Sequence, residues 1–475
     1  MAGITSYGAY IPYYRMPRSV MNAAWGRGGG RGERAVAGYD EDSTSMSVSA
    51  GIDCLKDTDP KTVDAVFMAT TTPPYIERQN SNIVANALDF RRDARNTDFG
   101  NCLRSGVSAL QAAMEAVGAG SLNSVLVTVA DMRLGECGGE FEQSSGDGAA
   151  AFLVGNEGVA VEVEGSYTYS DDLSDNWRID GDRFVSSWED RFGRDAGYSQ
   201  TPVEVVKGVL GKLNLTPKDI TKACIYGANA RAQGSLARAM GFAPEQVQDP
   251  MLENMGNTGA ALAPMILISA LEDAKPGDRF LMVSWGNGCD AVVLKATDEI
   301  EKIKDRRAIR RHLAVKGTLD NYGKYMRWRS LVPTAVRRGM RVAMSAEWRE
   351  RKLGLPLYGV KCLNCGTVQL SMSGSSMRTH ICLECQAKDN FEPYRFADKV
   401  GKTVSFSHDY LGGGINPPMT RAVIDFDGGG RGLFDMVDRD PEECKVGLPV
   451  EMTFRKTPLG PGSSSYFWKC KPVRE

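Results

Sequence analysis

The sequence predicts an α/β fold in which one unit is duplicated, followed by a smaller region of short strands. Apolar runs typical of buried strands alternate with helical segments from the N-terminus to residue 297. The order of turn and helix, strand, glycine turn and strand occurs twice in this stretch. "SWGNGCDAVVL" in its second half corresponds to "SSGDGAAAFLV" in its first. After Pro356 the sequence changes to short strands and Gly- or Pro-rich turns such as "LGGGINPP", which indicates a separate small β region.

The first half of the duplicated unit contains three predicted strands and one predicted helix. The run "VDAVFMATTT" at 63–72 is typical of a buried strand, and so are residues 124–131 and 146–155. Between the first two strands, residues 99–117 place apolar side chains at the spacing of an amphipathic helix.

The second half repeats this order. Residues 222–229 are a predicted strand, and residues 254–274 are a Gly-rich turn that runs into a helix. Two more strands are predicted at 279–288 and 290–297. In helix-covered sheets of this kind, ligands gather at strand ends and helix N-termini.

Cys102 is the first candidate functional residue, because it stands at the start of the helix predicted within residues 99–117, directly after Gly100 and Asn101. Unpaired amides and the helix dipole stabilise a thiolate at this end of a helix. A small buried cysteine is the simpler interpretation. The duplication, however, sets the Cys102 turn against the corresponding turn of Asn257 across a pseudo-twofold axis, which favours a functional site.

A cysteine nucleophile usually works with a histidine that moves its protons. The chain has three histidines, and all lie after residue 300, far from Cys102 in the sequence: His312, His380 and His408. The sequence therefore raises the question of which group performs the proton chemistry beside Cys102.

The sequence carries one strong metal motif. "CLNCG" at 362–366 and "CLEC" at 382–385 form two CxxC pairs at the spacing of a tetrahedral zinc ribbon. Four sulfur ligands close the coordination sphere, so a structural zinc is predicted rather than a catalytic one. The ligands of this predicted site are Cys362, Cys365, Cys382 and Cys385.

Composition limits the class of protein. With 42% hydrophobic and 24% charged residues the chain is typical of a soluble globular protein, and no apolar run of about 18 residues predicts a membrane span. The N-terminus lacks the features of a signal peptide, so the eleven cysteines indicate a cytoplasmic protein with free thiols and a metal site.

Charge is unevenly distributed. Residues 299–352 carry 16 Lys or Arg against 6 Asp or Glu, a net +10, which leaves −12 for the rest of the chain. A nucleic-acid site is one interpretation. Trp328 and Trp348 are interspersed with aliphatic residues, so an amphipathic contact between domains, with some arginines meeting the phosphates of a nucleotide-bearing thioester, is preferred.

The sequence does not assign a role to two further segments, residues 26–32 and 175–202. "GRGGGRG" at 26–32 follows no clear strand and opens no clear helix, so a flexible loop is favoured over a phosphate-binding loop. Residues 175–202 are aromatic and charged without a period. They are interpreted as an insertion that caps the ligand end of the sheet, or as a surface excursion.

With these residues in view, residues 1–297 resemble the thiolase superfamily, most closely the archaeal type of 3-hydroxy-3-methylglutaryl-CoA synthase. The resemblance implies a duplicated thiolase-like fold of αβαβα layers. It rests on stretches that cover the segment in order: "YGAYIPYYRM", "DEDSTSMSV", "NIVANAL", C102-x3-G-x2-AL, "GDGAAA", "NMGNTGAA" and "AKPGDRFLMVSWGNG". Residues 354–475 resemble the zinc-ribbon and OB-fold proteins that accompany archaeal thiolase and synthase subunits as channelling partners, here fused to the catalytic region.

The domain boundaries follow from these assignments. Residues 1–165 are the predicted N-terminal thiolase-like half with the nucleophile, and 166–297 the C-terminal half. Residues 298–353 form a basic connecting arm, 354–390 a zinc ribbon, and 391–475 a small β-barrel of the OB-fold type.

The resemblance also implies roles for single residues. Cys102 stands at the acyl-accepting cysteine, and Asn257 at the asparagine that helps bind the thioester oxygen. Tyr226 stands where the family has its histidine, with Asn229 retained, and Thr71 stands where the synthase has its general-base glutamate. The departures at Tyr226 and Thr71 argue against authentic hydroxymethylglutaryl-CoA formation.

Three functions are consistent with these residues. The preferred one is a thiolase-like acyltransferase that makes or breaks a C–C bond of a coenzyme A thioester through acyl-Cys102, with Tyr226 and Asn257 polarising the carbonyl. The second is a retro-aldol lyase that uses Tyr226 without Cys102. The third is a non-catalytic channelling subunit bound to a thiolase. A homodimer or larger assembly, with a second thiolase-type subunit as one option, is expected from the resemblance.

Overall fold

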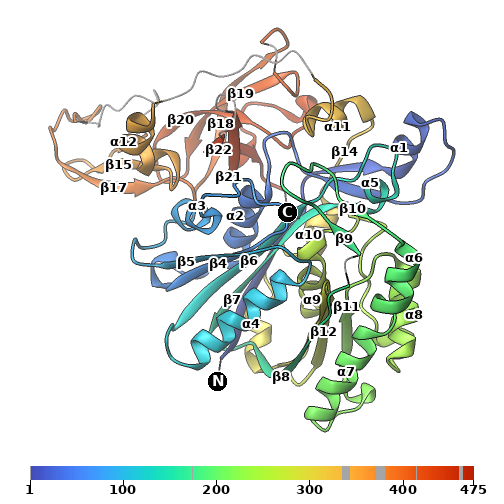
Figure 1. The fold of residues 1–475 in the computed structure, drawn as a ribbon. Helices are drawn as coiled ribbons and strands as arrows, with labels where there is room; N and C mark the ends of the chain where they lie inside the picture. The colour runs from blue at the N-terminus through green and yellow to red at the C-terminus, as the bar shows by residue number, and fades with distance from the viewer. Residues whose placement is uncertain are drawn as a thin grey trace. The chain divides into compact units, whose positions relative to one another are not determined.

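The computed structural model describes residues 2–173, 175–333, 343–370, 380–412, 414–458 and 464–474. The chain divides into two compact units, drawn with their elements in Figure 1. The first unit comprises Met1–Ala37, Asp42–Ala85 and Phe90–Asp320, and the second comprises Gly38–Glu41, Asn86–Asp89 and Asn321–Glu475.

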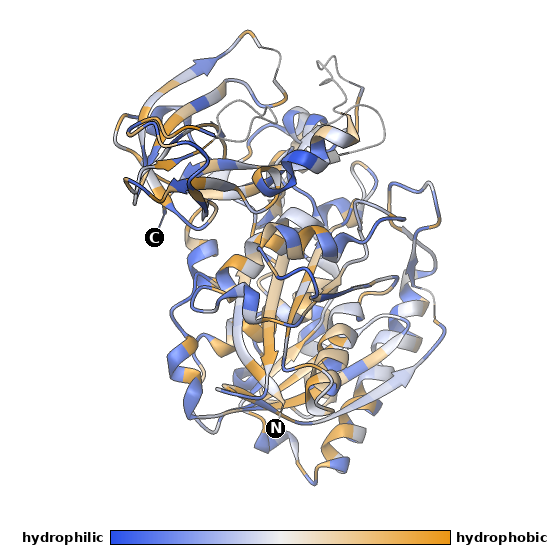
Figure 2. Ribbon diagram, turned by 90° about the vertical axis from the view of Figure 1, so that its left-hand side faces the viewer, coloured by the Kyte–Doolittle hydropathy of each residue, from blue (hydrophilic) through white to orange (hydrophobic). Residues whose placement is uncertain are grey.

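The first unit is built on a nine-stranded sheet (Figure 1). In spatial order its strands are β11 (Lys222–Ile225), β12 (Arg279–Trp285), β13 (Gly288–Ala296), β8 (Val161–Ser170), β1 (Gly3–Tyr10), β7 (Asp147–Gly155), β6 (Ser124–Met132), β4 (Ala65–Ala69) and β5 (Arg95–Phe99). Figure 2 shows the inner strands of this sheet predominantly in the hydrophobic colour, as expected for strands covered on both faces.

The strand pairings repeat in the two halves of this sheet. Strand β4 is parallel to β6, β6 is antiparallel to β7, and β7 is antiparallel to β1. In the same order, β11 is parallel to β12, β12 is antiparallel to β13, and β13 is antiparallel to β8. The antiparallel pair β1–β8 joins the halves. The predicted duplicated α/β fold is confirmed.

The helices follow the same duplication. Helix α2 (Ser43–Cys54) packs against β1 and β7, and α7 (Thr201–Lys212) packs against the corresponding strands β8 and β13. Helices α4 (Ser105–Gly118) and α9 (Leu262–Leu271) each follow one of the two candidate turns.

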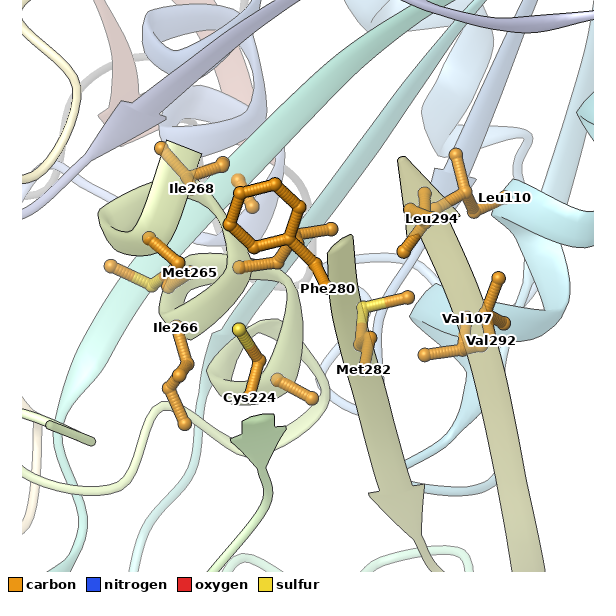
Figure 3. Packing of buried hydrophobic residues seen from close by; sticks show 14 of the residues in the cluster. Val107, Leu110, Cys224, Met265, Ile266, Ile268, Phe280, Met282, Val292 and Leu294 are labelled. Carbon is orange, nitrogen blue, oxygen red and sulfur yellow. The ribbon is translucent and has the colours of Figure 1, made fainter. Parts of the chain in front are cut away.

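Helix α9 is a buried inner layer, because it contacts β11 and β12 of one half and β7 of the other. All of its residues except Ser269 are buried, as expected for a helix that is apolar on every side. Figure 3 shows its side chains with Phe280 of β12, and Val107 and Leu110 of α4 beside Val292 and Leu294 of β13. The candidate turns therefore start helices that a packed core holds in place.

Smaller elements complete the first unit. They are β2 (Tyr14–Pro17), α1 (Arg18–Ala24), β3 (Glu33–Val36), α3 (Asn80–Ala87, whose last residues belong to the second unit), α5 (Glu140–Ser144), β9 (Asn176–Trp177), β10 (Ser186–Ser187), α6 (Asp190–Phe192), α8 (Ala230–Ala239), α10 (Arg310–Ala314) and β14 (Gly317–Thr318). No helix of the described residues is long and apolar enough to cross a membrane.

The second unit contains a three-stranded sheet and a closed barrel. The sheet has the order β16 (Val368–Gln369), β15 (Tyr358–Cys362), β17 (Phe391–Arg395). The barrel has the order β18 (Val400–Asp409), β19 (Met419–Phe426), β20 (Arg431–Met436), β22 (Ser464–Pro472), β21 (Pro449–Pro458), with helices α11 (Tyr322–Trp328) and α12 (Met344–Gly354) preceding both sheets in the chain. The predicted small β-barrel is confirmed, and its assignment as an OB-fold stays a prediction.

Two of the predicted domain limits do not coincide with the ends of elements or units in the structure. The boundary at 165/166 lies within β8, and the predicted arm 298–353 is divided at Asp320 between the two units. Residues 334–342 of that arm lie outside the described residues. Strand β8 pairs with β13 along most of its length and with β1 at its start, and the predicted domain boundaries stay predictions.

Candidate active site

Cys102 lies in a turn just before α4 rather than in its first turn. The helix begins at Ser105 with Arg104 as its N-cap, and Asn101 has a φ of 72° that ends the preceding strand segment. Apolar periodicity alone placed the helix start three residues too early, because it does not register such a left-handed residue. Cys102 is partly buried, and no side chain of the described residues hydrogen-bonds its Sγ.

The Cys102 turn is held in place by contacts of the two residues that follow Cys102, Leu103 and Arg104. Arg104 donates from Nε to the carbonyl of Gly286 at 3.2 Å and pairs with Asp290 at 3.1 Å. A Cβ on Gly286 would stand 3.0 Å from that of Leu103, so glycine is needed there for close approach. At the start of α4, the Cβ position of Gly106 is 3.0 Å from the carbonyl oxygen of Ala260. The first turn of α4 therefore touches the turn that follows Asn257, while the predicted pairing of Cys102 with Asn257 stays a prediction.

Asn257 is held in a defined orientation. Its backbone N–H donates to Ser144 at 2.8 Å, and its carbonyl accepts from the N–H of Gly146 at 2.8 Å. The side-chain Oδ1 accepts from the N–H of Gly259 at 2.9 Å. Because that oxygen is occupied, the amide NH2 group points the other way, and Nδ2 donates to the hydroxyl of Tyr226 at 3.0 Å.

Tyr226 follows β11 and is buried, with 6% of its surface exposed. Its backbone N–H donates to Val283 at 2.9 Å, and its carbonyl accepts from the hydroxyl of Tyr198 at 2.8 Å. Burial raises the pKa of the Tyr226 phenol, against a smaller lowering by Arg133 and by the hydrogen bond from Asn257. The neutral phenol accepts from Asn257, which leaves its own proton to donate to a bound oxygen.

Tyr226, Asn229 and Asn257 line one cavity of about 600 Å³. Cys102 and Thr71 are not among its lining residues, although Trp285, next to the Gly286 that contacts the Cys102 turn, is one of them. Asn229 is also the N-cap of α8, and its side chain accepts from the N–H of Ala232 at 2.9 Å.

The segment 175–202 lines the same cavity, which favours the capping interpretation of this insertion. It supplies residues of the short β9–β10 pair and of the irregular turns around it to the wall: Asp175, Asn176, Val185, Ser186, Ser187, Arg194 and Tyr198. The glycine-rich segment 26–32 is absent from the lining, and Arg31 within it pairs with Glu253 at 3.1 Å.

Thr71 is tied to a carboxylate that the sequence did not single out. Fully buried Asp131, at the end of β6, accepts from the N–H and the hydroxyl of Thr71 at 2.7 and 2.8 Å. It also accepts from the N–H of Ala260 at 2.8 Å and from the hydroxyls of Thr70 and Thr72 at 3.0 and 3.1 Å. Five donors make Asp131 an anchor for the "TTT" loop and for the turn after Asn257.

The four predicted metal ligands lie together in the second unit. Their sulfur atoms are all within 4.8 Å of one another, with Sγ–Sγ distances of 3.7 Å for Cys362–Cys385 and 3.5 Å for Cys365–Cys382. Sulfur ligands about 2.3 Å from a tetrahedral zinc are about 3.8 Å apart, so the cluster fits zinc. His380 is half-exposed and contacts Asp389 through Nδ1 at 2.5 Å.

Comparisons with known proteins agree on the type of fold. Residues 210–295 match the family model "3-Oxoacyl-[acyl-carrier-protein (ACP)] synthase III C terminal". The chain is 30% identical over 335 residues to hydroxymethylglutaryl-CoA synthase of Methanopyrus kandleri, covering 68% of this chain and 95% of that protein. It is 34% identical over 313 residues to the enzyme of that name from Pyrococcus furiosus, covering 64% and 89%.

Solved structures show the same fold at lower identity. A crystal structure of HMG-CoA synthase complexed with CoA superimposes with a TM-score of 0.61 at 16% identity, over 69% of this chain and 89% of that one. The 3-oxoacyl-[acyl-carrier-protein] synthase III of Aquifex aeolicus gives 0.54 at 22% identity, over 62% and 100%.

Proposed function

We propose a function for this chain from the premise that it belongs to the hydroxymethylglutaryl-CoA synthase family of the thiolase superfamily. Proteins of this family are condensing enzymes that use acyl thioesters. The proposed activity is an acyltransfer that makes or breaks a C–C bond beside the thioester of an acyl-CoA. The observation that carries it is the pair of donors, Asn257 and Tyr226, at the wall of one cavity next to the Cys102 turn.

Cys102 is the proposed acyl acceptor. In the cleaving direction its thiolate attacks the C3 carbonyl of a 3-oxoacyl-CoA, and the bond between C2 and C3 breaks. The acyl group stays on Sγ, and the departing enolate takes a proton to become acetyl-CoA or a 2-substituted acetyl-CoA. Free CoA then attacks the acyl-cysteine, which releases the shortened acyl-CoA and restores the thiol. In the forming direction the same steps run in reverse.

Asn257 and Tyr226 suit the stabilisation of the enolate oxygen. The Asn257 amide is oriented by Gly259, and the buried phenol of Tyr226 keeps its proton. Donors fixed in a water-poor site stabilise developing negative charge without reorganising. Asn229, which also lines the cavity, is the proposed further contact for the bound thioester.

The proposed reaction differs from hydroxymethylglutaryl-CoA synthesis, although the relatives carry that name. Thr71 and Tyr226 stand at the positions that the resemblance gives to the glutamate and the histidine of the synthase. The Thr71 hydroxyl is engaged with Asp131 at 2.8 Å, and a threonine has no carboxylate to take a proton. We therefore expect no hydroxymethylglutaryl-CoA from acetyl-CoA and acetoacetyl-CoA.

A retro-aldol lyase acting on a β-hydroxyacyl-CoA is the second candidate. It is favoured by one observation: Tyr226 lines the cavity, whereas Cys102 does not. A retro-aldol reaction needs a base for the hydroxyl proton and donors for the enolate, but no nucleophile. It therefore predicts that a Cys102 variant keeps its activity and a Tyr226 variant loses it.

The four cysteines are proposed to hold a structural zinc ion, since their spacing fits a tetrahedral ion and leaves no position open. Zinc would cross-link the two CxxC turns, where Gly366 and Gln386 donate backbone N–H groups to the carbonyls of Cys362 and Cys382. A cytoplasmic homodimer, with or without a second thiolase-type subunit, is the assembly expected from the family.

Turnover of a panel of 3-oxoacyl-, β-hydroxyacyl- and simple acyl-CoAs tests the proposal, with products identified by liquid chromatography and mass spectrometry. Cys102→Ala should reduce acyltransfer more than about 1000-fold. Cys137→Ala, which removes another partly buried thiol, should leave it unchanged. Full activity of Cys102→Ala on a β-hydroxyacyl-CoA would favour the lyase. Turnover of no substrate, with stable binding to a thiolase, would favour a channelling subunit.

A further inference from the structure

The proposed chemistry needs a group that takes and returns a proton, and neither Thr71 nor Tyr226 supplies one. Tyr226 has a raised pKa and therefore serves as a donor. Asp131, the nearest carboxylate to Thr71, is saturated by five donors. The carboxylates that line the cavity are Glu136, Glu140 and Asp175.

Asp175 is one of these three, and its charge raises the pKa of the Tyr226 phenol. It also interacts with Arg133, which in turn acts on Tyr226. Asp175, Arg133, Tyr226 and Asn257 thus come from four separate segments and line one cavity. This juxtaposition puts a carboxylate into the same cavity as the two donors to which an enolate oxygen would bind.

Asp175 is also held in position by its surroundings. It directly precedes β9, which pairs with β10 through Trp177–Ser186 and Asn176–Ser187. Its carboxylate accepts a hydrogen bond from the side-chain amide of Asn176. Gly193 packs beside it, since a Cβ there would lie 3.4 Å from the Cβ of Asp175. A group fixed in this way keeps a defined direction into the cavity.

We propose that Asp175 is the catalytic acid–base of this site, which takes the α-proton of the acyl-CoA and returns it in the cleaving direction. This inference rests on the proposed function. In the forming direction the carboxylate removes a proton from C2, and the enolate oxygen accepts hydrogen bonds from Tyr226 and Asn257. The enolate carbon then attacks acyl-Cys102, a C–C bond forms, and the C–S bond breaks to release the Cys102 thiolate.

The environment of Asp175 suits this role. Burial raises the pKa of its carboxyl, while the hydrogen bond from Asn176 and the charge of Arg133 oppose the rise. A base whose pKa lies nearer to neutral exchanges protons more effectively in both directions. The charged and titratable groups that line the same cavity, and would modulate this pKa, are Arg133, Glu136, Glu140, Arg194 and Tyr226.

Exchange of the α-protons tests this proposal separately from acyltransfer. The full chain is incubated in D2O with an acyl-CoA that it turns over, and deuterium at C2 is measured by mass spectrometry. Asp175→Asn should slow exchange by at least about 100-fold. Acylation of Cys102 and the melting temperature should stay within error. Asp172→Asn, an exposed aspartate three residues earlier that does not line the cavity, should exchange at the wild-type rate.

The pH profile separates a chemical role from a structural one. In the wild type, the rate of α-proton exchange should rise with pH as the Asp175 carboxyl loses its proton. This rising part of the pH profile should shift in Asp175→Glu and vanish in Asp175→Asn. Exchange at the wild-type rate in Asp175→Asn would overturn the proposal. An unshifted rise of the exchange rate with pH in a folded Asp175→Glu would overturn it as well. Exchange that depends on Asp175 without any acylation of Cys102 would support Asp175 and overturn the covalent mechanism.

Discussion

Two aspartates, the fully buried Asp131 and the partly buried Asp175, show how the scaffold and the insertion divide their tasks. Asp131 ends β6 of the duplicated framework and accepts from five donors on the Thr70–Thr72 loop and the turn of Ala260. Asp175 belongs to the inserted segment 175–202 and faces the cavity. The difference teaches that a carboxylate saturated by backbone and hydroxyl donors holds the framework, whereas one that faces the cavity is available for proton transfer.

The largest expected effect on stability is at Asp131. Asp131→Ala would leave the N–H groups of Thr71 and Ala260 without their acceptor inside the first unit. Unsatisfied buried donors cost about 1–3 kcal/mol each, so we expect a loss of about 3 kcal/mol or more. Calorimetric unfolding measures it, with Asp175→Ala as the comparison, where a loss of about 1 kcal/mol or less is expected. Equal losses of unfolding free energy in Asp131→Ala and Asp175→Ala would contradict the different roles given to the two aspartates.

A large effect on rate with a small effect on stability is expected at Tyr226. Tyr226→Phe removes the donor aimed at the substrate oxygen and leaves the ring packed in place, so kcat should fall about 100-fold. Steady-state kinetics of the reaction established for the wild type measures this. A variant with unchanged kcat would show that the hydroxyl only supports Asn257.

The metal cluster should behave independently of both aspartates. We expect about one zinc ion per chain by elemental analysis, and none in Cys382→Ser. Loss of zinc should lower the melting temperature of the second unit, because the sheet β16–β15–β17 consists of three short strands. Cys444→Ser, which changes a partly buried thiol outside the cluster, should keep both the metal and the melting temperature. Retention of zinc in Cys382→Ser would refute this ligand set.

The smallest expected effect concerns the alkaline side of the pH profile. A phenol in water titrates near pH 10, and burial raises the pKa of Tyr226 above that value. The protonated donor should therefore persist as pH rises, and kcat should show no alkaline loss attributable to Tyr226 up to about pH 10. An alkaline limb below about pH 9 that disappears in Tyr226→Phe would contradict this.

Much of the framework could be predicted from sequence periodicity, because each half buries its strands and its inner helix. The metal cluster of four cysteines could be predicted because the spacing of a CxxC pair places both of its sulfur atoms where they can bind one metal ion. The start of α4 could not be predicted, since Asn101 adopts a positive φ that the pattern of apolar residues does not indicate. Asp131 was hidden at the end of a predicted strand, and its five donors come from two other segments, the Thr70–Thr72 loop and the turn at Ala260.

Asp175 could not be predicted for a different reason. It lies in a segment without period, whose short β9–β10 pair depends on contacts formed only after folding. The roles of Cys102, Tyr226, Asn229 and Asn257 came from the resemblance and stay predictions. The structure adds the cavity shared by the last three and the donor geometry of Tyr226 and Asn257.

Covalent labelling of Cys102 tests the central claim most directly. The chain is incubated with the acyl-CoAs that it turns over, quenched in acid, and measured as intact protein before and after peptide mapping. We expect a mass increase of one acyl group on the peptide that contains Cys102, retained in Asp175→Asn and Cys137→Ala and absent in Cys102→Ala. Undiminished turnover by Cys102→Ala, with no acyl group on any wild-type peptide, would contradict the covalent mechanism.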